Sequence, residues 1–216
     1  MAASASAAGP PSRPARRRTT TRAQLISAAT AVFEETGTTN VSVGAICTRA
    51  GFTRGAFYSN FNTVDDLFFA LYQDRNVEVA ARMQEAFARA SREGSGETLE
   101  GSVKEVLAAL PVDETWFAIR AIFFSRAHRN EDVAEHLREH ADQLRTALQP
   151  SLLEAVSRAG REVTVDDKTF THAVIAAHVG AAIQRVTYAR PDEIRHDAVL
   201  GVLTGLTRPR DCLRSR

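Results

Sequence analysis

The feature that most constrains this chain is a stretch of 20 residues, 42–61, in which two short helical segments meet at a glycine. It reads SVGAICTRAGFTRGAFYSNF. Ser42 and Thr53 are residue types that favour the N-cap of a helix, and Gly51 between them can adopt the positive φ that a sharp turn requires. Ile46 and its apolar neighbours can hold the two segments together. The stretch therefore predicts a helix-turn-helix, a rigid corner that can present its second helix to the major groove of DNA.

The start of this second helix has the chemistry of a DNA reader. Arg54 can reach base edges, and the small residues Gly55 and Ala56 allow a close approach to the groove. Hydrogen bonds to phosphate oxygens can come from the polar side chains that follow, Tyr58, Ser59 and Asn60. Base edges and phosphates would thus both be within reach of one short helix.

The distribution of charge agrees with a polyanionic partner for the N-terminal part. Residues 1–62 carry seven arginines and two glutamates, a net charge of +5, whereas the remainder carries 20 basic and 24 acidic residues, a net charge of −4. A basic head on a slightly acidic body favours binding of nucleic acid by the head. A solvated basic tail would give the same balance, so charge alone does not decide between the two.

Composition excludes several other classes of protein. No apolar run approaches the roughly 18 residues that would suggest a membrane span. The N-terminal sequence MAASASAAGPPSRPARRR lacks the apolar core of a signal peptide, so we do not expect export. Cys47 and Cys212 form no CxxC pair, which argues against a zinc knuckle or a disulfide scaffold. We expect a protein of the reducing cytoplasm.

Helical patterns continue on both sides of the corner. Ile26, Ala29 and Phe33 recur at helical spacing, and Gly37 can end that helix. A capping box formed by Thr63 and Asp66 would begin a fourth helix that ends near residue 92, before the break at 93–97. Further helices are expected over residues 98–109, 112–129, 131–159, 167–189 and 192–206. Pro150 should kink or split the third of these, residues 163–166 should form a break, and strand signals are almost absent.

The expected fold is all-α, with a three-helix N-terminal helix-turn-helix domain and a C-terminal helical bundle. The domain organisation that we predict is a disordered basic arm over residues 1–20, the helix-turn-helix domain over 21–66, the helical bundle over 67–208 and a disordered tail over 209–216.

The segment GFTRGAFYSNF closely resembles the signature of the TetR family of bacterial repressors, and the resemblance extends from about residue 22 to residue 71. It implies a homodimeric transcriptional repressor that binds a palindromic operator in double-stranded DNA and is released by a small, largely apolar effector. It implies no enzymatic activity, cofactor, metal or membrane partner. The DNA-binding residues that it implies, beyond those of the second helix, are Arg22, Ser42, Val43 and Thr53.

Two positions depart from the family pattern. The family often has histidine where this chain has Asn60, which remains a plausible phosphate donor. It usually has a lysine at the start of the fourth helix, where this chain reads Asn62, Thr63 and Val64. The arginines at positions 16–18 and 22 can supply the missing charge by contacting phosphates or the minor groove.

The resemblance also implies that the C-terminal domain dimerises through its last two helices and contains an effector pocket. Residues 172–183, HAVIAAHVGAAI, are apolar on nearly every face, so a helix there must be covered on more than one side. A second subunit or the centre of a monomeric bundle could provide that cover. The interface residues that we predict are Ala177, Ala181, Gln184, Tyr188 and Leu203. The pocket residues that we predict are Trp116, Phe117, Arg120, Phe123, Phe124 and His172, although core packing is the more common role for each aromatic residue taken singly.

Two alternative sites need to be weighed. The segment 136–140 fits HxxEH, in which His136 and His140 could hold zinc with Glu139 as a base, but no third ligand is evident. Cys47 could be a redox sensor, although a buried core residue is the more common role of a free cysteine. The fourth helix would follow the recognition helix directly and continue into the body, so the resemblance implies that effector binding moves it.

Overall fold

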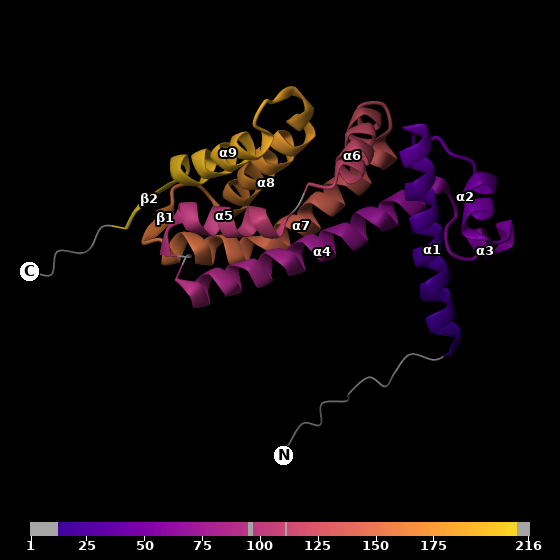
Figure 1. Ribbon diagram of the computed structural model, residues 1–216, viewed down its shortest axis with the longest axis horizontal. Coiled ribbons are helices and arrows are strands. Elements are labelled where there is room, and N and C mark those ends of the chain that lie inside the picture. Colours follow the sequence, from indigo (N-terminus) through magenta and orange to yellow (C-terminus); the bar gives the residue numbers. More distant parts are fainter. Residues whose placement is uncertain (1–12, 95–96, 111, 211–216) are drawn as a thin grey trace, which may run out of the picture. The chain divides into compact units, whose positions relative to one another are not determined.

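A computed structural model describes residues 13–94, 97–110 and 112–210 (Figure 1). The described residues divide into two compact units, one ending at Leu71 and the other beginning at Tyr72. Helix α4, Val64–Glu93, supplies residues to both units. The predicted boundary at residues 66/67 also lies within this helix.

The N-terminal unit consists of α1 (Arg13–Thr36), α2 (Val43–Ala50), α3 (Arg54–Tyr58) and the first turns of α4. Its core is formed by one or more apolar side chains from each helix, including Leu25, Phe33, Ile46, Phe57 and Leu67. Each of these helices is too short or too polar to be stable alone, so burial of this shared apolar face stabilises the unit. The three-helix arrangement predicted for this part of the chain is confirmed.

Local signals in the sequence explain where these helices begin and end. Helix α1 ends before Gly37, which has a φ of 67° and accommodates the left-handed conformation that closes a helix. At the start of α4, the Thr63 hydroxyl accepts a hydrogen bond from the Asp66 amide at 3.0 Å, and the Asp66 carboxylate accepts one from the Thr63 amide at 3.1 Å. The predicted capping box is therefore confirmed.

The prediction of a disordered arm over residues 1–20 is wrong from residue 13 onward, because α1 begins at Arg13. Alanine and arginine favour helix, and Pro14 lies in the first turn, where its missing N–H removes no intrahelical hydrogen bond. Residues 1–12 lie outside the described residues, as do residues 211–216 of the predicted tail.

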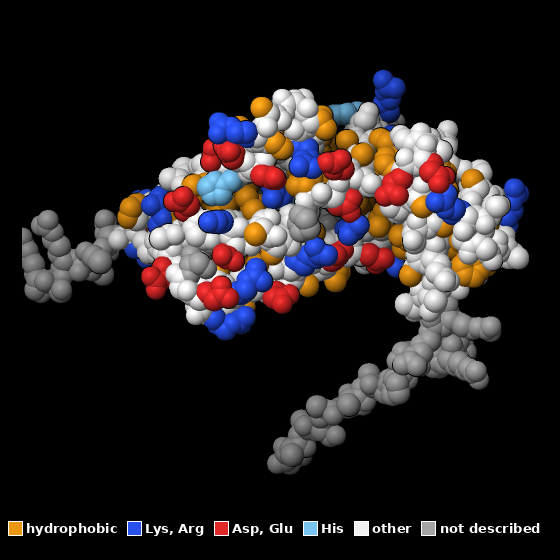
Figure 2. Space-filling view, viewed as in Figure 1, with side chains coloured by type: hydrophobic (Ala, Val, Ile, Leu, Met, Phe, Trp, Pro, Cys, Tyr) orange, Lys and Arg blue, Asp and Glu red, His pale blue; other side chains and the backbone are white. Residues whose placement is uncertain are grey.

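The second unit is a helical bundle built from the rest of α4 and from elements that follow it. They are α5 (Leu99–Ala109), α6 (Glu114–Ala127), α7 (Glu131–Arg158), β1 (Arg161–Val163), α8 (Asp167–Ile183), the 3₁₀ helix η2 (Arg185–Thr187), α9 (Pro191–Gly205) and β2 (Thr207–Pro209). Side chains from α4, α5, α7, α8 and α9 share one apolar core, and α8 packs along α9 (Figure 1). Figure 2 shows acidic and basic side chains interspersed over the face of this unit that it presents.

Three details of the second unit differ from the sequence-based expectation. Pro150 does not split α7, because buried Leu148 and Leu152 on either side hold the helix in the core. Helix α8 ends at Ile183 and is followed by a 3₁₀ turn, so the predicted helix over 167–189 is too long. The expected break at 163–166 overlaps at its first residue with β1, which pairs antiparallel with β2. Pairing between segments this far apart in sequence leaves no local signal.

Candidate functional site

The corner between α2 and α3 is fixed by three hydrogen-bonded or conformational features. The Ser42 hydroxyl accepts a hydrogen bond from the Ala45 amide at 3.1 Å, and the Thr53 hydroxyl accepts one from the Ala56 amide at 3.2 Å. Gly51 has a φ of 71°, as the turn requires. Both N-caps and the glycine turn predicted from the sequence are confirmed, and they set the direction in which α3 leaves α2.

Helix α3 has an anchored inner face and an open outer face. Phe57 is fully buried, and its ring lies 5.7 Å from that of Phe61. The ring of Tyr58 lies edge-on to that of Phe57 at 5.5 Å, yet 58% of Tyr58 is exposed. Because Phe57 fixes the rotation of the helix, Arg54, Gly55 and Tyr58 are presented to solvent together.

Gly44 positions the Arg54 side chain and was missed by the sequence analysis. A Cβ atom at Gly44 would lie 3.2 Å from Nη2 of Arg54, so the guanidinium lies over the bare backbone at the start of α2. The glycine itself was the signal in the sequence. Glycine within a helix lowers helix stability by about 1 kcal/mol relative to alanine, so a glycine in the first turn of α2 indicates that a larger side chain would not fit there. The small size of Gly44 keeps the long Arg54 side chain close to the corner.

Two of the remaining predicted DNA-binding residues, Ser59 and Asn60, follow α3 and already have local hydrogen bonds. The Asn60 amide donates to the Ala56 carbonyl at 2.8 Å, and the Ser59 hydroxyl donates to the same carbonyl at 2.9 Å. These two side chains therefore close the C-terminal end of α3. Arg22 on α1 and Val43 on α2 are half-buried. Contact of any of these residues with DNA stays a prediction.

Cys47 lies within the corner as a buried free thiol whose sulfur is 3.6 Å from the Thr53 carbonyl oxygen. Burial raises the pKa of the Cys47 thiol, and the charge of Arg54 opposes this only partly. The thiolate is the reactive form of cysteine, so a raised pKa favours the role of core residue over that of redox sensor.

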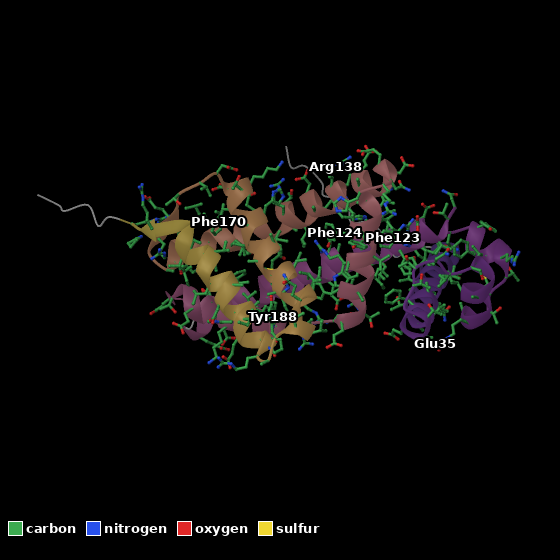
Figure 3. The ribbon with its side chains drawn as sticks, turned by 90° about the horizontal axis from the view of Figure 1, so that it is seen from above. Glu35, Phe123, Phe124, Arg138, Phe170 and Tyr188 are labelled. Atoms are coloured by element: carbon green, nitrogen blue, oxygen red, sulfur yellow. The ribbon has the colours of Figure 1, made fainter. Side chains whose placement is uncertain are left out.

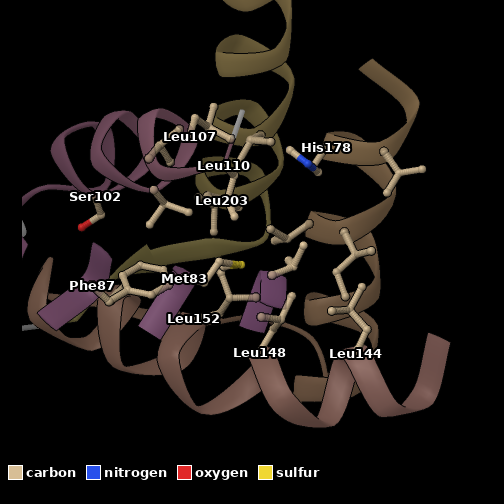
Figure 4. A pocket seen from close by; sticks show the side chains of 18 of the residues that line it. Met83, Phe87, Ser102, Leu107, Leu110, Leu144, Leu148, Leu152, His178 and Leu203 are labelled. Atoms are coloured by element: carbon tan, nitrogen blue, oxygen red, sulfur yellow. The ribbon is translucent and has the colours of Figure 1, made fainter. Parts of the chain in front are cut away.

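The second unit encloses an apolar cavity with a volume of about 90 Å³ (Figure 4). Helices α4, α5, α6, α7, α8 and α9 all contribute to its wall. The apolar side chains that dominate the wall include Met83, Phe87, Leu107, Leu144, Leu148 and Leu152. The lining, apolar with a few polar groups, has the character of a small-molecule site.

Three of the six predicted pocket residues line this cavity, and three do not. Trp116, Phe117 and Arg120 lie in its wall. Phe123 lies one turn further along α6, where the Tyr72 ring packs edge-on against it at 5.8 Å and fills the space. Its neighbour Phe124 is 43% exposed (Figure 3). The assignment of these two phenylalanines to the pocket is therefore wrong.

The assignment of His172 to the pocket is also wrong, because a different histidine of α8 lines the cavity. His178 contributes to the wall, and its ring lies 6.1 Å from that of Phe117. His172 instead acts electrostatically on Asp142 of α7. Val174 and His178, four residues apart, lie on the face of α8 that lines the cavity, but the apolar pattern of this helix could not distinguish that face in the sequence.

Polar groups in the wall differ in how well they are paired. Arg75 forms ion pairs with Glu78 at 2.9 Å and with Asp113 at 2.5 Å. The Asn76 amide donates a hydrogen bond to the His140 carbonyl at 3.0 Å. Two other polar side chains of the wall have buried atoms without a partner. Nε of Arg120 and Nδ1 of His178 are inaccessible to solvent and form no hydrogen bond within the described structure.

The predicted interface residues on α8 and α9 divide between the core and the surface. Leu203 is 5% exposed and lines the cavity, and Ala181 is also buried within the chain. Helix α8 is apolar on every face, and its pattern could not distinguish these faces. Ala177 and Tyr188 are half-buried, and Gln184 is exposed.

The HxxEH segment lies on α7 with its two histidines in different surroundings. His136 is exposed, and its Nδ1 lies 2.8 Å from the Asp132 carbonyl oxygen. The His140 ring lies 5.7 Å from the Tyr72 ring inside the unit. Within the described ranges, no group of three or more His, Cys, Asp or Glu side chains is arranged to hold a metal ion. No helix of the described residues is long and apolar enough to cross a membrane.

Comparison with known proteins shows that the part of the chain containing α2 and α3 is similar to a known family. Residues 25–71 match the model of the family described as bacterial regulatory proteins, tetR family. A curated relative is the HTH-type transcriptional repressor Rv1474c of Mycobacterium tuberculosis (strain ATCC 25618 / H37Rv), 30% identical over 126 residues that cover 58% of this chain and 61% of the relative. The chain thus aligns with about three fifths of the length of this relative.

Solved structures share the fold over nearly the whole chain. The TetR-family transcriptional regulator SCO4454 from Streptomyces coelicolor is 19% identical, with a TM-score of 0.60 over 91% of this chain and 97% of that protein. RolR in complex with its ligand resorcinol is 21% identical, with a TM-score of 0.56 over 87% of this chain and 89% of RolR. At these identities the likeness establishes the all-α fold with an N-terminal helix-turn-helix.

Proposed function

Because the chain belongs to the TetR family of bacterial regulatory proteins, we propose that it is a transcriptional repressor that binds operator DNA as a homodimer. A small, largely apolar effector would release it from the operator. The observation that carries the proposal is the outer face of α3, where a capped and anchored helix presents Arg54 and Tyr58 to solvent. A short helix held in this way can enter the major groove without rearrangement of the corner.

A homodimer would place two such helices on one face of the DNA. The outer surface of η2 and α9 supports this assembly, because Val186 is 86% exposed and Ile194 is 42% exposed. A second copy that covered these two side chains would remove their apolar surface from water. A twofold dimer reads an inverted repeat, with recognition helices about 34–36 Å apart.

Release by an effector is supported by the position of α4. This helix supplies Val79, Met83 and Phe87 to the cavity wall, and its first turns belong to the unit that contains α3. The structural relative RolR was solved in complex with its ligand resorcinol, a small aromatic molecule. An effector that binds the two states of the repressor unequally would shift operator affinity, typically by about 1–3 kcal/mol.

The test is binding of the full chain to duplex fragments from the region upstream of its own gene, followed by fluorescence anisotropy. Arg54→Ala and Tyr58→Ala should each weaken binding at least tenfold, because they remove the exposed groups of α3. Arg129→Ala is the matched control, since it removes an equal charge from an exposed position of the other unit and should change affinity less than twofold.

Failure of the wild-type chain to bind any of these duplexes, even at low salt, would overturn the proposed function. Specific binding that Arg54→Ala and Tyr58→Ala leave intact would contradict the role of α3. Zinc bound at one ion per chain, together with peptidase activity, would instead favour the HxxEH alternative.

A further inference from the structure

The charged side chains in the wall of the cavity are all positive. Its charged side chains are Arg75 and Arg120, and no aspartate or glutamate among the described residues lines it. The charge of Arg75 is balanced outside the wall by Glu78 and Asp113. No such acidic partner lies beside Arg120 in the wall, and its Nε is inaccessible to solvent and has no hydrogen-bond partner in the described part of the chain. One uncompensated positive charge therefore belongs to the cavity.

The surroundings of Arg120 make this charge costly in the empty cavity. Burial lowers the pKa of the Arg120 guanidinium, yet the ordinary value is so high that the group stays protonated at neutral pH. Its favourable contact is the ring of Phe124, whose centroid lies 5.3 Å from the guanidinium carbon. A buried cation normally has an anionic partner, and here the protein supplies none among its described residues.

His178 is a second polar group in the wall of the cavity. Figure 4 shows its ring extending inward from α8, at the end away from Phe87. Burial, together with the charges of Arg195 and Arg120, lowers the pKa of His178 to about 4. The imidazole is therefore neutral near pH 7 and carries one N–H donor. A guanidinium and a neutral imidazole can both donate hydrogen bonds to the same anionic group.

We propose that the effector is an apolar carboxylic acid, bound as its monoanion, whose carboxylate pairs with Arg120 and accepts a hydrogen bond from His178. Its hydrocarbon body lies against the apolar wall near Met83, Leu107 and Leu148. That an effector exists rests on the proposed function, and the chemical class of that effector is the new element. A neutral ligand would leave the guanidinium unmatched, and a dianion would exceed the single unpaired charge.

The experiment compares two acids with their amides, which have the same shape without the charge. The probes are 3-phenylpropanoate and octanoate, with 3-phenylpropanamide and octanamide as neutral counterparts, titrated into the full chain at pH 7.5 by calorimetry. At least one acid should bind ten or more times as tightly as its amide. Arg120→Met should reduce that ratio to about one, whereas Arg158→Met, which removes an exposed arginine of α7, should preserve it.

The thermal stability of the ligand-free variants separates pairing from a structural role. Arg120→Met should melt at the same temperature as the wild type or above it, because the substitution removes an unpaired buried charge. If Arg120→Met does not fold, Arg120→Gln provides the same comparison with a neutral polar side chain. Acids that bind no better than their amides, no binding by either acid, or a preference that survives the loss of Arg120 would each overturn the proposal. Duplex binding measured without probes separates these results from a failure of the proposed function.

Discussion

Lowering the pH should destabilise the protein through His178. The pKa of this histidine is lowered from 6.5 to about 4, mainly by burial and further by the charges of Arg195 and Arg120. Between these two values the unfolded chain holds more protons than the folded chain, so the free energy of unfolding falls as the pH falls through this window. The contribution of His178 is fully present above pH 6.5, and about 2 kcal/mol of it is lost between pH 7 and pH 5.

The assay is urea denaturation followed by circular dichroism at pH 7 and pH 5, at one protein concentration, for the wild type and for His178→Leu. The difference in free energy of unfolding between the two proteins should shift by about 2 kcal/mol in favour of the variant at pH 5. His136→Gln, at an exposed position of α7, is the control and should follow the wild type. If His178→Leu loses as much stability as the wild type between the two pH values, the imidazole is solvated and the reasoning fails.

Two further predictions concern backbone groups. Gly51→Ala should destabilise the N-terminal unit by about 1–2 kcal/mol in urea denaturation, because the added Cβ meets no atom within 4 Å but strains the φ of 71°. Gly55→Ala, at ordinary φ, should be neutral or stabilising, and equal losses in both variants would contradict this reasoning. Arg195→Met should destabilise the chain by about 2–3 kcal/mol, since Arg195 donates to the carbonyls of Leu110 at 2.9 Å and Leu107 at 3.2 Å where α5 ends. Arg190→Met, at an exposed ion pair, should cost less than about 1 kcal/mol, and a loss of similar size for both arginines would show that these carbonyls are solvated.

Local signals in the sequence define the corner and its resemblance to the TetR family. The caps at Ser42 and Thr53 and the turn at Gly51 are local, because each depends on a few consecutive residues. Chemistry of this kind is legible in a sequence, since residue type and short spacing fix the hydrogen bonds. The bounds of α5 and the capping box of α4 could be predicted for the same reason.

Tertiary structure alone decided which residues share the cavity. Helix α8 is apolar on every face, so its periodicity could not show that His178 rather than His172 lines the wall, or that Ala181 is buried within the chain. The pairing of β1 with β2 depends on contact between segments that are distant in the sequence. The same holds for Arg120, whose lack of an acidic partner is a property of all six helices that surround it. Periodicity identifies which residues of a helix are apolar, whereas the neighbours that each face meets are set by the packing of the whole unit.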